Sequence, residues 1–137
     1  MNINTVRDGV ISKIKFVFPG VKVTGEKIRQ GLKVPQFFVK ILLSEQEREL
    51  NRRYKRMHTF DIHYFATSNE DAHKVAEKLY SEMEYIEVSQ GKIRGRKMRH
   101  EVFDNVLHFF VDYDFHVLRE IESVPKMQRM EEDIQHG

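Results

Sequence analysis

The sequence contains no cysteine among its 137 residues. This absence excludes disulfide bonds, a thiol nucleophile and a metal site built on thiolates. The chain also has no apolar run close to the ~20 residues that a membrane-spanning helix needs, and Arg7 and Asp8 interrupt any signal-like start. We therefore expect a protein that is made inside the cell and has no membrane partner.

The chain also lacks an excess of charge of one sign. It has 23 basic and 21 acidic residues, so the net charge is only +2. This balance argues against a dedicated nucleic-acid binder. The charges are nevertheless segregated: residues 52–56 and 92–99 carry only positive charges, and residues 70–87 are mainly acidic. Such a chain can meet a copy of itself with opposite charges facing, so we expect self-association.

Apolar residues make up 40% of the chain and charged residues 32%, as expected for a folded core with a charged surface. The length fits one domain. We predict a single domain over residues 1–118. Residues 119–137 are predicted to form a charged C-terminal tail that is mobile or ordered only by a partner.

Hydrophobic spacing predicts helices over residues 3–18 and from Ser68 to about Tyr85, with Ser68 as the N-cap of the second helix. Strands are predicted at residues 21–25, 36–43, 51–65, 86–88 and as a pair within 98–118 that turns at Asp104-Asn105. Residues 44–51 are predicted to be a loop or one helical turn. The order α-β-β-β-α-β-β-β predicts the α+β class: a mainly antiparallel β-sheet with two α-helices packed on one face.

In the last predicted strand the odd positions are all apolar and the even positions are mostly His and Asp. Its odd positions are Leu107, Phe109, Val111, Tyr113, Phe115 and Val117, and its even positions are His108, Phe110, Asp112, Asp114, His116 and Leu118. Neighbouring side chains of a strand point to opposite faces of the sheet. One face of this strand is therefore predicted to lie on the core, and the other to meet water.

Together with the basic and aromatic stretch at residues 49–65, this last strand pair resembles the small tail terminator proteins of tailed phages and Bacillus-type prophages. The resemblance covers roughly residues 3–118. It implies a structural protein of the virion tail, assembled in the bacterial host cytoplasm, with no enzymatic activity and no cofactor. It further implies a homohexameric ring that caps the tail tube protein, ends tail polymerisation and joins the head-completion or connector protein. Genome DNA would only pass through the ring.

The resemblance supplies no residue-level motif, so interface residues are predicted from charge and position alone. Aromatic and arginine side chains tend to anchor protein interfaces. The predicted interface residues are Arg53, Tyr54, Arg56, Arg96 and Arg99.

The polar face of the last strand suggests an alternative, a metal-dependent nuclease or resolvase-like enzyme that uses His108, Asp112 and Asp114. His116 lies on the same face, and Asp61 and His63 on the preceding long strand extend it. An ordinary water-facing row explains the same alternation, and Phe110 interrupts the possible ligands. We therefore predict no catalytic, cofactor-binding or metal-binding residue. A third alternative is a small basic assembly or chaperone factor that is absent from the finished particle.

The remaining motifs predict no further chemistry. The basic segment 92–100 could contact phosphates, but lysine and arginine are also common on strand edges, where they prevent unwanted pairing. The glycines match no phosphate-binding loop. Four of them are predicted to be turn residues: Gly25, Gly31, Gly91 and Gly95.

Overall fold

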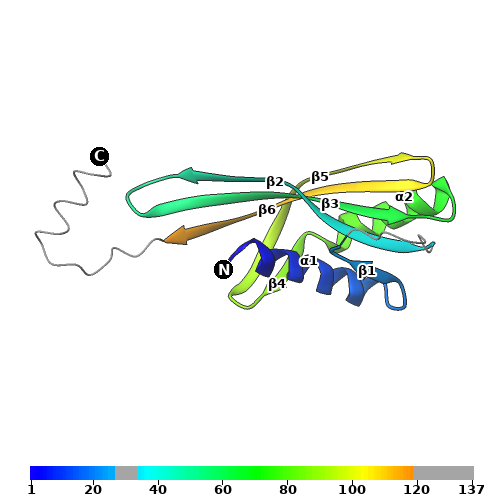
Figure 1. The fold of residues 1–137 in the computed structure, drawn as a ribbon, viewed down its shortest axis with the longest axis horizontal. Helices are drawn as coiled ribbons and strands as arrows, with labels where there is room; N and C mark the ends of the chain where they lie inside the picture. The colour runs from blue at the N-terminus through cyan, green and yellow to red at the C-terminus, as the bar shows by residue number, and fades with distance from the viewer. Residues whose placement is uncertain (27–33, 119–137) are drawn as a thin grey trace, which may run out of the picture.

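A six-stranded sheet with both helices on one face forms the body of the protein, as the computed structural model shows (Figure 1). The structure describes residues 1–26 and 34–118. Its elements are α1 (Ile3–Val17), β1 (Lys22–Thr24), β2 (Gln36–Arg48), β3 (Arg53–Phe65), α2 (Asn69–Glu82), β4 (Tyr85–Val88), β5 (Gly91–Phe103) and β6 (Val106–Leu118). The strand order is β1-β2-β3-β6-β5-β4, and only the β1–β2 pair is parallel. The predicted α+β class and element order are confirmed. The predicted tail, 119–137, and Gly31 lie outside the described residues.

Each helix begins at a side-chain cap. Asn2 accepts a hydrogen bond from the Thr5 amide at 3.0 Å, and Ser68 accepts one from the Asp71 amide at 3.0 Å. These bonds satisfy amides that have no partner within the helix, so the predicted N-cap at Ser68 is confirmed. Within the described residues, neither helix is long and apolar enough to cross a membrane.

The core lies between the helices and one face of the sheet. The helices contribute the buried side chains Val6, Val10, Ile14, Ala72, Val75, Ala76 and Leu79. From β6 the buried side chains are Leu107, Phe109, Val111, Tyr113 and Phe115, the odd positions of the strand. The alternation in the sequence therefore predicts the buried face of β6 correctly.

Residues 44–48 differ from the prediction of a loop or helical turn over 44–51, whereas residues 49–51 do lie outside the strands. β2 continues to Arg48, which pairs with Tyr54 of β3. Polar strand residues are stable here because the ladder to β3 satisfies their backbone groups. A turn with Asn51 at φ 53° closes the hairpin. We call this hairpin, residues 43–59, the distal arm; its tip projects beyond both helices in Figure 1.

The turn between β5 and β6 lies at Asp104-Asn105, as predicted. Both residues have positive φ values, 52° and 63°, which two-residue hairpin turns of the primed types require. The Asn105 amide donates to Asn69 Oδ1 at 2.9 Å, so this turn is joined to the start of α2.

Candidate functional site

The five predicted interface residues lie in two groups. Arg53, Tyr54 and Arg56 lie on the half of β3 that belongs to the distal arm, whereas Arg96 and Arg99 lie in the middle of β5. The strand β6 lies between β3 and β5 and separates the two groups. The structure therefore does not gather these residues into one patch.

Neighbouring side chains hold the arm group in place. Arg53 Nε lies 3.1 Å from Glu49 Oε1, and Arg56 donates from Nε to Gln46 Oε1 at 2.9 Å. The Arg53 side chain is still 53% exposed. Exposed ion pairs contribute little stability, so these contacts mainly fix where the positive charges lie.

A β-bulge presents the second group. The register of β5 against β6 shifts between Arg96 and Arg99, and Lys97 within the bulge has a φ of 53°. The Arg99 guanidinium lies 5.1 Å from the centre of the Phe110 ring and donates to the Lys97 carbonyl at 2.8 Å. Both arginines are exposed. β4 pairs with residues 91–94, and the Gly95 amide donates to the Glu84 carbonyl. Residues 96–103 of β5 therefore form an open strand edge in the described part of the chain.

The opposite side of the sheet has a second open edge. β1 pairs with β2 only at residues 36–38, so the arm half of β2 has no second strand partner among the described residues. This edge carries exposed Glu45 and Glu47, with exposed Arg48 at its end. In the acidic region predicted at residues 70–87, Glu84 lies 3.5 Å from Arg94.

The polar face of β6 is more ordered than a simple water-facing row. Asp112 accepts a hydrogen bond from Thr59 Oγ1 at 2.7 Å, and Asp114 lies 3.9 Å from Lys55 Nζ. The Asp61 residue on β3 is only 5% exposed. The prediction that Asp61 meets water is wrong, because imidazole rings on the same face cover it.

Two histidines contact the Asp61 carboxylate. His63 Nε2 lies 2.8 Å from Asp61 Oδ2, and His108 Nδ1 lies 3.1 Å from the same oxygen. The register places His63 directly opposite His108 on neighbouring strands, with ring centroids 4.3 Å apart. Each neutral imidazole can donate one N–H, so this buried carboxylate has the hydrogen bonds that its charge requires.

The ligand set of the nuclease alternative is not assembled. His108 and Asp112 are four residues apart on one strand, roughly 13 Å at the usual rise. Among residues 1–26 and 34–118, only Asp61, His63 and His108 place possible metal-ligand atoms within 4.8 Å of one another. Asp112 and Asp114 therefore do not join His108 in a single site in this structure.

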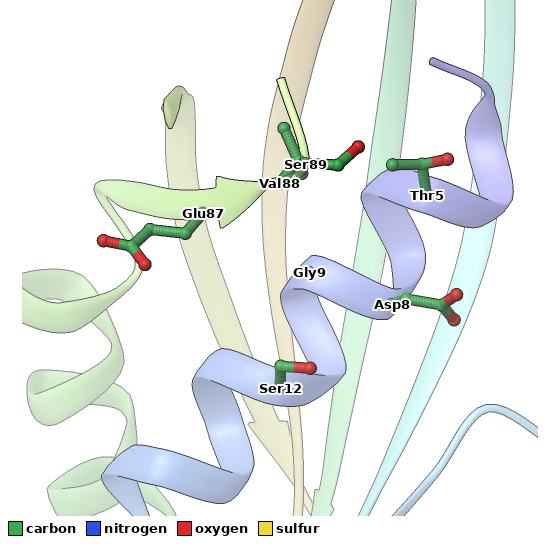
Figure 2. A pocket seen from close by; sticks show the side chains of 7 residues that line it. All are labelled: Thr5, Asp8, Gly9, Ser12, Glu87, Val88 and Ser89. Atoms are coloured by element: carbon green, nitrogen blue, oxygen red, sulfur yellow. The ribbon is translucent and has the colours of Figure 1, made fainter. Parts of the chain in front are cut away.

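A shallow groove between α1 and β4 is a feature that the sequence analysis missed (Figure 2). Its volume is about 360 Å³, and it is lined by Thr5, Asp8, Gly9, Ser12, Glu87, Val88 and Ser89. In Figure 2 the carboxylates of Asp8 and Glu87 point away from each other, so they do not form a catalytic pair. One pattern in the sequence could have indicated this groove, the row of small residues Thr5, Gly9 and Ser12 along one side of α1. Small side chains on this side allow the helix to approach β4 closely.

His58 is a buried titratable group at the base of the distal arm. It is 3% exposed, and its Nδ1 lies 3.2 Å from Ser44 Oγ. Burial lowers the pKa of His58 below its ordinary value, Arg56 lowers it further, and Asp114 opposes the shift. A histidine with a lowered folded pKa is protonated more readily in the unfolded chain.

We expect this difference to weaken the fold in acid. As the pH falls below 6.5, the ordinary value, the unfolded state takes up a proton that folded His58 resists, so the free energy of unfolding falls. The variant His58→Gln lacks this term. Urea unfolding of both proteins between pH 7.5 and pH 5 should show a steeper loss for the unmodified protein, and parallel curves would contradict the assignment.

The structure is thus that of a small α+β protein with charged side chains on two open strand edges, those of β2 and β5. A family model described as phage tail terminator protein matches residues 5–125. The chain belongs to this family. The match confirms the resemblance seen in the sequence and makes the protein a structural component of the phage tail.

The other two comparisons add no functional argument. No curated protein matches the chain. One chain among the solved structures has a TM-score of 0.49 and 11% sequence identity, and the match covers 90% of this chain and 99% of that chain. That likeness is too low to support an argument, so the assignment to a family depends on the sequence match.

Proposed function

We propose that this protein closes into a homohexameric ring on the last ring of tail tube protein, stops tail polymerisation and forms the joint to the head-completion protein. Membership of the tail terminator family is the observation that carries this proposal. The DNA genome would pass through the bore without being read. No sequence-specific contact is needed for that passage.

The charges of the strand edges support a ring. A ring of identical subunits needs a head-to-tail contact, in which one surface of each subunit meets a different surface of the next. The arm edge carries Glu45 and Glu47, and the β5 edge carries Arg96, Lys97 and Arg99. Because these edges lie on opposite sides of the sheet order, an acidic edge can face a basic edge around the ring.

The predicted interface residues then divide between two roles. Arg96 and Arg99 belong to the subunit contact of the ring. Arg53, Tyr54 and Arg56 lie on the β3 strand of the distal arm, which projects beyond the helices. In this proposal they contact the tube protein or the connector, while the β2 edge of the same arm contacts the next subunit. Arginine and tyrosine side chains are frequent anchors of such contacts.

Deletion of the gene tests the overall function. Electron microscopy of particles from the deletion strain should show tail tubes of uncontrolled length with no heads attached. Normal particles would refute the proposal. The protein should also be present in purified virions, since an assembly factor that is absent from the finished particle is the competing function.

A charge-reversal experiment tests the ring contact. The double variant Arg96→Glu/Arg99→Glu should lose ring formation and block head joining, because like charges then face across the contact. Adding Glu45→Lys and Glu47→Lys in the same chain should restore assembly. Lys74→Glu on α2 is a control for charge alone. Native mass spectrometry and complementation of the deletion strain report assembly, and failure of the four-fold variant to recover would contradict the pairing of these edges.

A further inference from the structure

The Asp61, His63 and His108 cluster brings one carboxylate and two imidazoles together, which are residue types that bind transition metals. His63 Nε2 and His108 Nδ1 lie 2.8 Å and 3.1 Å from Asp61 Oδ2. The three donor atoms converge on one point between β3 and β6.

The spacing fits a small transition-metal ion. Zn²⁺ binds imidazole nitrogen and carboxylate oxygen at about 2.0–2.2 Å, which places tetrahedral ligand atoms roughly 3.3 Å apart. The possible ligand atoms of the cluster all lie within 4.8 Å of one another. Side-chain rotations within this limit would convert the two contacts to Asp61 into a three-ligand site, with no change in the register of His63 opposite His108.

The surroundings leave one side of the cluster open. Phe38 and Phe65 pack against the His63 ring, and Phe110 is stacked on His108. The side chains of His63 and His108 are 17% and 29% exposed, against 7% for Asp61. Water or a further ligand can therefore reach the two imidazoles from the helix-free face, while the carboxylate stays enclosed.

Charged groups around the cluster have both signs. Lys40 lies opposite Asp61 on β2, and Glu101 lies opposite His108 on β5. The Arg99 guanidinium lies over the Phe110 ring. Lys40 disfavours a bound cation and Glu101 favours it. The affinity of the cluster for a metal ion therefore depends mainly on its three ligand atoms.

The geometry points to a binding site for one divalent transition-metal ion of the Zn²⁺ class, with His63, His108 and Asp61 as its protein ligands and water completing the coordination. Two nitrogen donors disfavour Mg²⁺ and Ca²⁺, which prefer oxygen ligands. The ion would join β3 to β6 on the face that carries no helix. This inference goes beyond the proposed ring, since the site is complete within one subunit.

Metal titration of the purified full chain tests the site. Untagged protein is treated with a chelator, dialysed, and titrated with ZnCl₂ by calorimetry and with CoCl₂ by visible absorption. We expect one ion per chain for both metals and no saturable binding of MgCl₂. Binding should weaken in acid, because metal ligands must be deprotonated.

Matched variants locate the ligands. His63→Ala and His108→Ala should each lower Zn²⁺ affinity at least ~100-fold, more than the loss of an outer-shell partner usually causes. His116→Ala, on the same face of β6, should bind as the unmodified protein does. Circular dichroism of each metal-free variant checks the fold, and His108→Gln replaces any alanine variant that unfolds. Absence of saturable binding, or binding that survives at both histidine positions, would overturn the site. Tail assembly plays no part in this measurement, so its outcome is independent of the proposed ring.

Discussion

Replacement of Tyr113 by alanine should lower the free energy of unfolding by about 3–5 kcal/mol, the usual cost of truncating a buried aromatic side chain. Tyr113 is fully buried on the core face of β6, and its ring lies 5.9 Å from that of Phe60. Its hydroxyl donates to the Met83 carbonyl at 2.6 Å. The variant would lose both packing and this bond. A single domain is typically stable by 5–15 kcal/mol, so urea unfolding should show a large shift of the midpoint.

The variant Tyr113→Phe separates the two contributions. It keeps the ring but leaves the Met83 carbonyl without this donor, which should cost about 1–2 kcal/mol. Burial raises the pKa of the Tyr113 hydroxyl, so the group remains protonated and able to donate at any pH that the fold survives. A phenylalanine variant as unstable as the alanine variant would show that the hydrogen bond, and not packing, holds α2 to the sheet.

The same core face shows how far the sequence predicts the fold. Apolar residues at alternate positions of β6 predict which face is buried, because alternation is a property of the strand itself. Ser68 predicts the start of α2, and Asp104-Asn105 predicts the last turn, for similar local reasons. Each of these signals depends on residues that are close in sequence.

Features that depend on pairing with another strand were missed. Residues 44–48 are polar and resemble a loop, but they form a strand because β3 lies beside them. Asp61 looks exposed in the sequence, and its burial depends on the register that places His63 opposite His108. Turns fix register within a hairpin, but no short turn joins β3 to β6, so no local signal gives this pairing. For the same reason, the prediction from charge and position placed five residues in one interface, whereas the sheet divides them between β3 and β5.

Gly95 was predicted to be a turn residue, and this prediction is wrong. It lies inside β5, and its amide donates to the Glu84 carbonyl at 2.6 Å. A Cβ atom at this position would lie 2.7 Å from the Met83 carbonyl oxygen and 2.9 Å from Val111 Cγ2. The glycine is therefore required by close approach of the chain after α2, and not by a turn.

The variant Gly95→Ala should consequently lower the free energy of unfolding by about 3 kcal/mol, the upper end of the usual cost of overpacking. The nearest obstacle is a backbone oxygen, which a side-chain rotation cannot remove. Gly20→Ala is the matched control, because a Cβ there meets nothing within 4 Å and only its positive φ of 87° is strained. That strain alone should cost about 1 kcal/mol. Thermal and urea unfolding of both variants measure the difference.

A second substitution distinguishes backbone from side-chain crowding at Gly95. In Gly95→Ala/Val111→Ala the methyl group 2.9 Å away is removed, while the Met83 carbonyl stays where β4 and the Tyr113 hydroxyl hold it. Val111 is buried, so Val111→Ala is destabilising by itself and is the reference for the double variant. The cost of Gly95→Ala should be smaller by about 0.5–1 kcal/mol in this background than in the unmodified protein. A cost near zero in the Val111→Ala background would show that Val111 causes the crowding. Costs that simply add would show that the chain after α2 moves away from β5 when the methyl group is introduced, and that the close approach at Gly95 is not rigid.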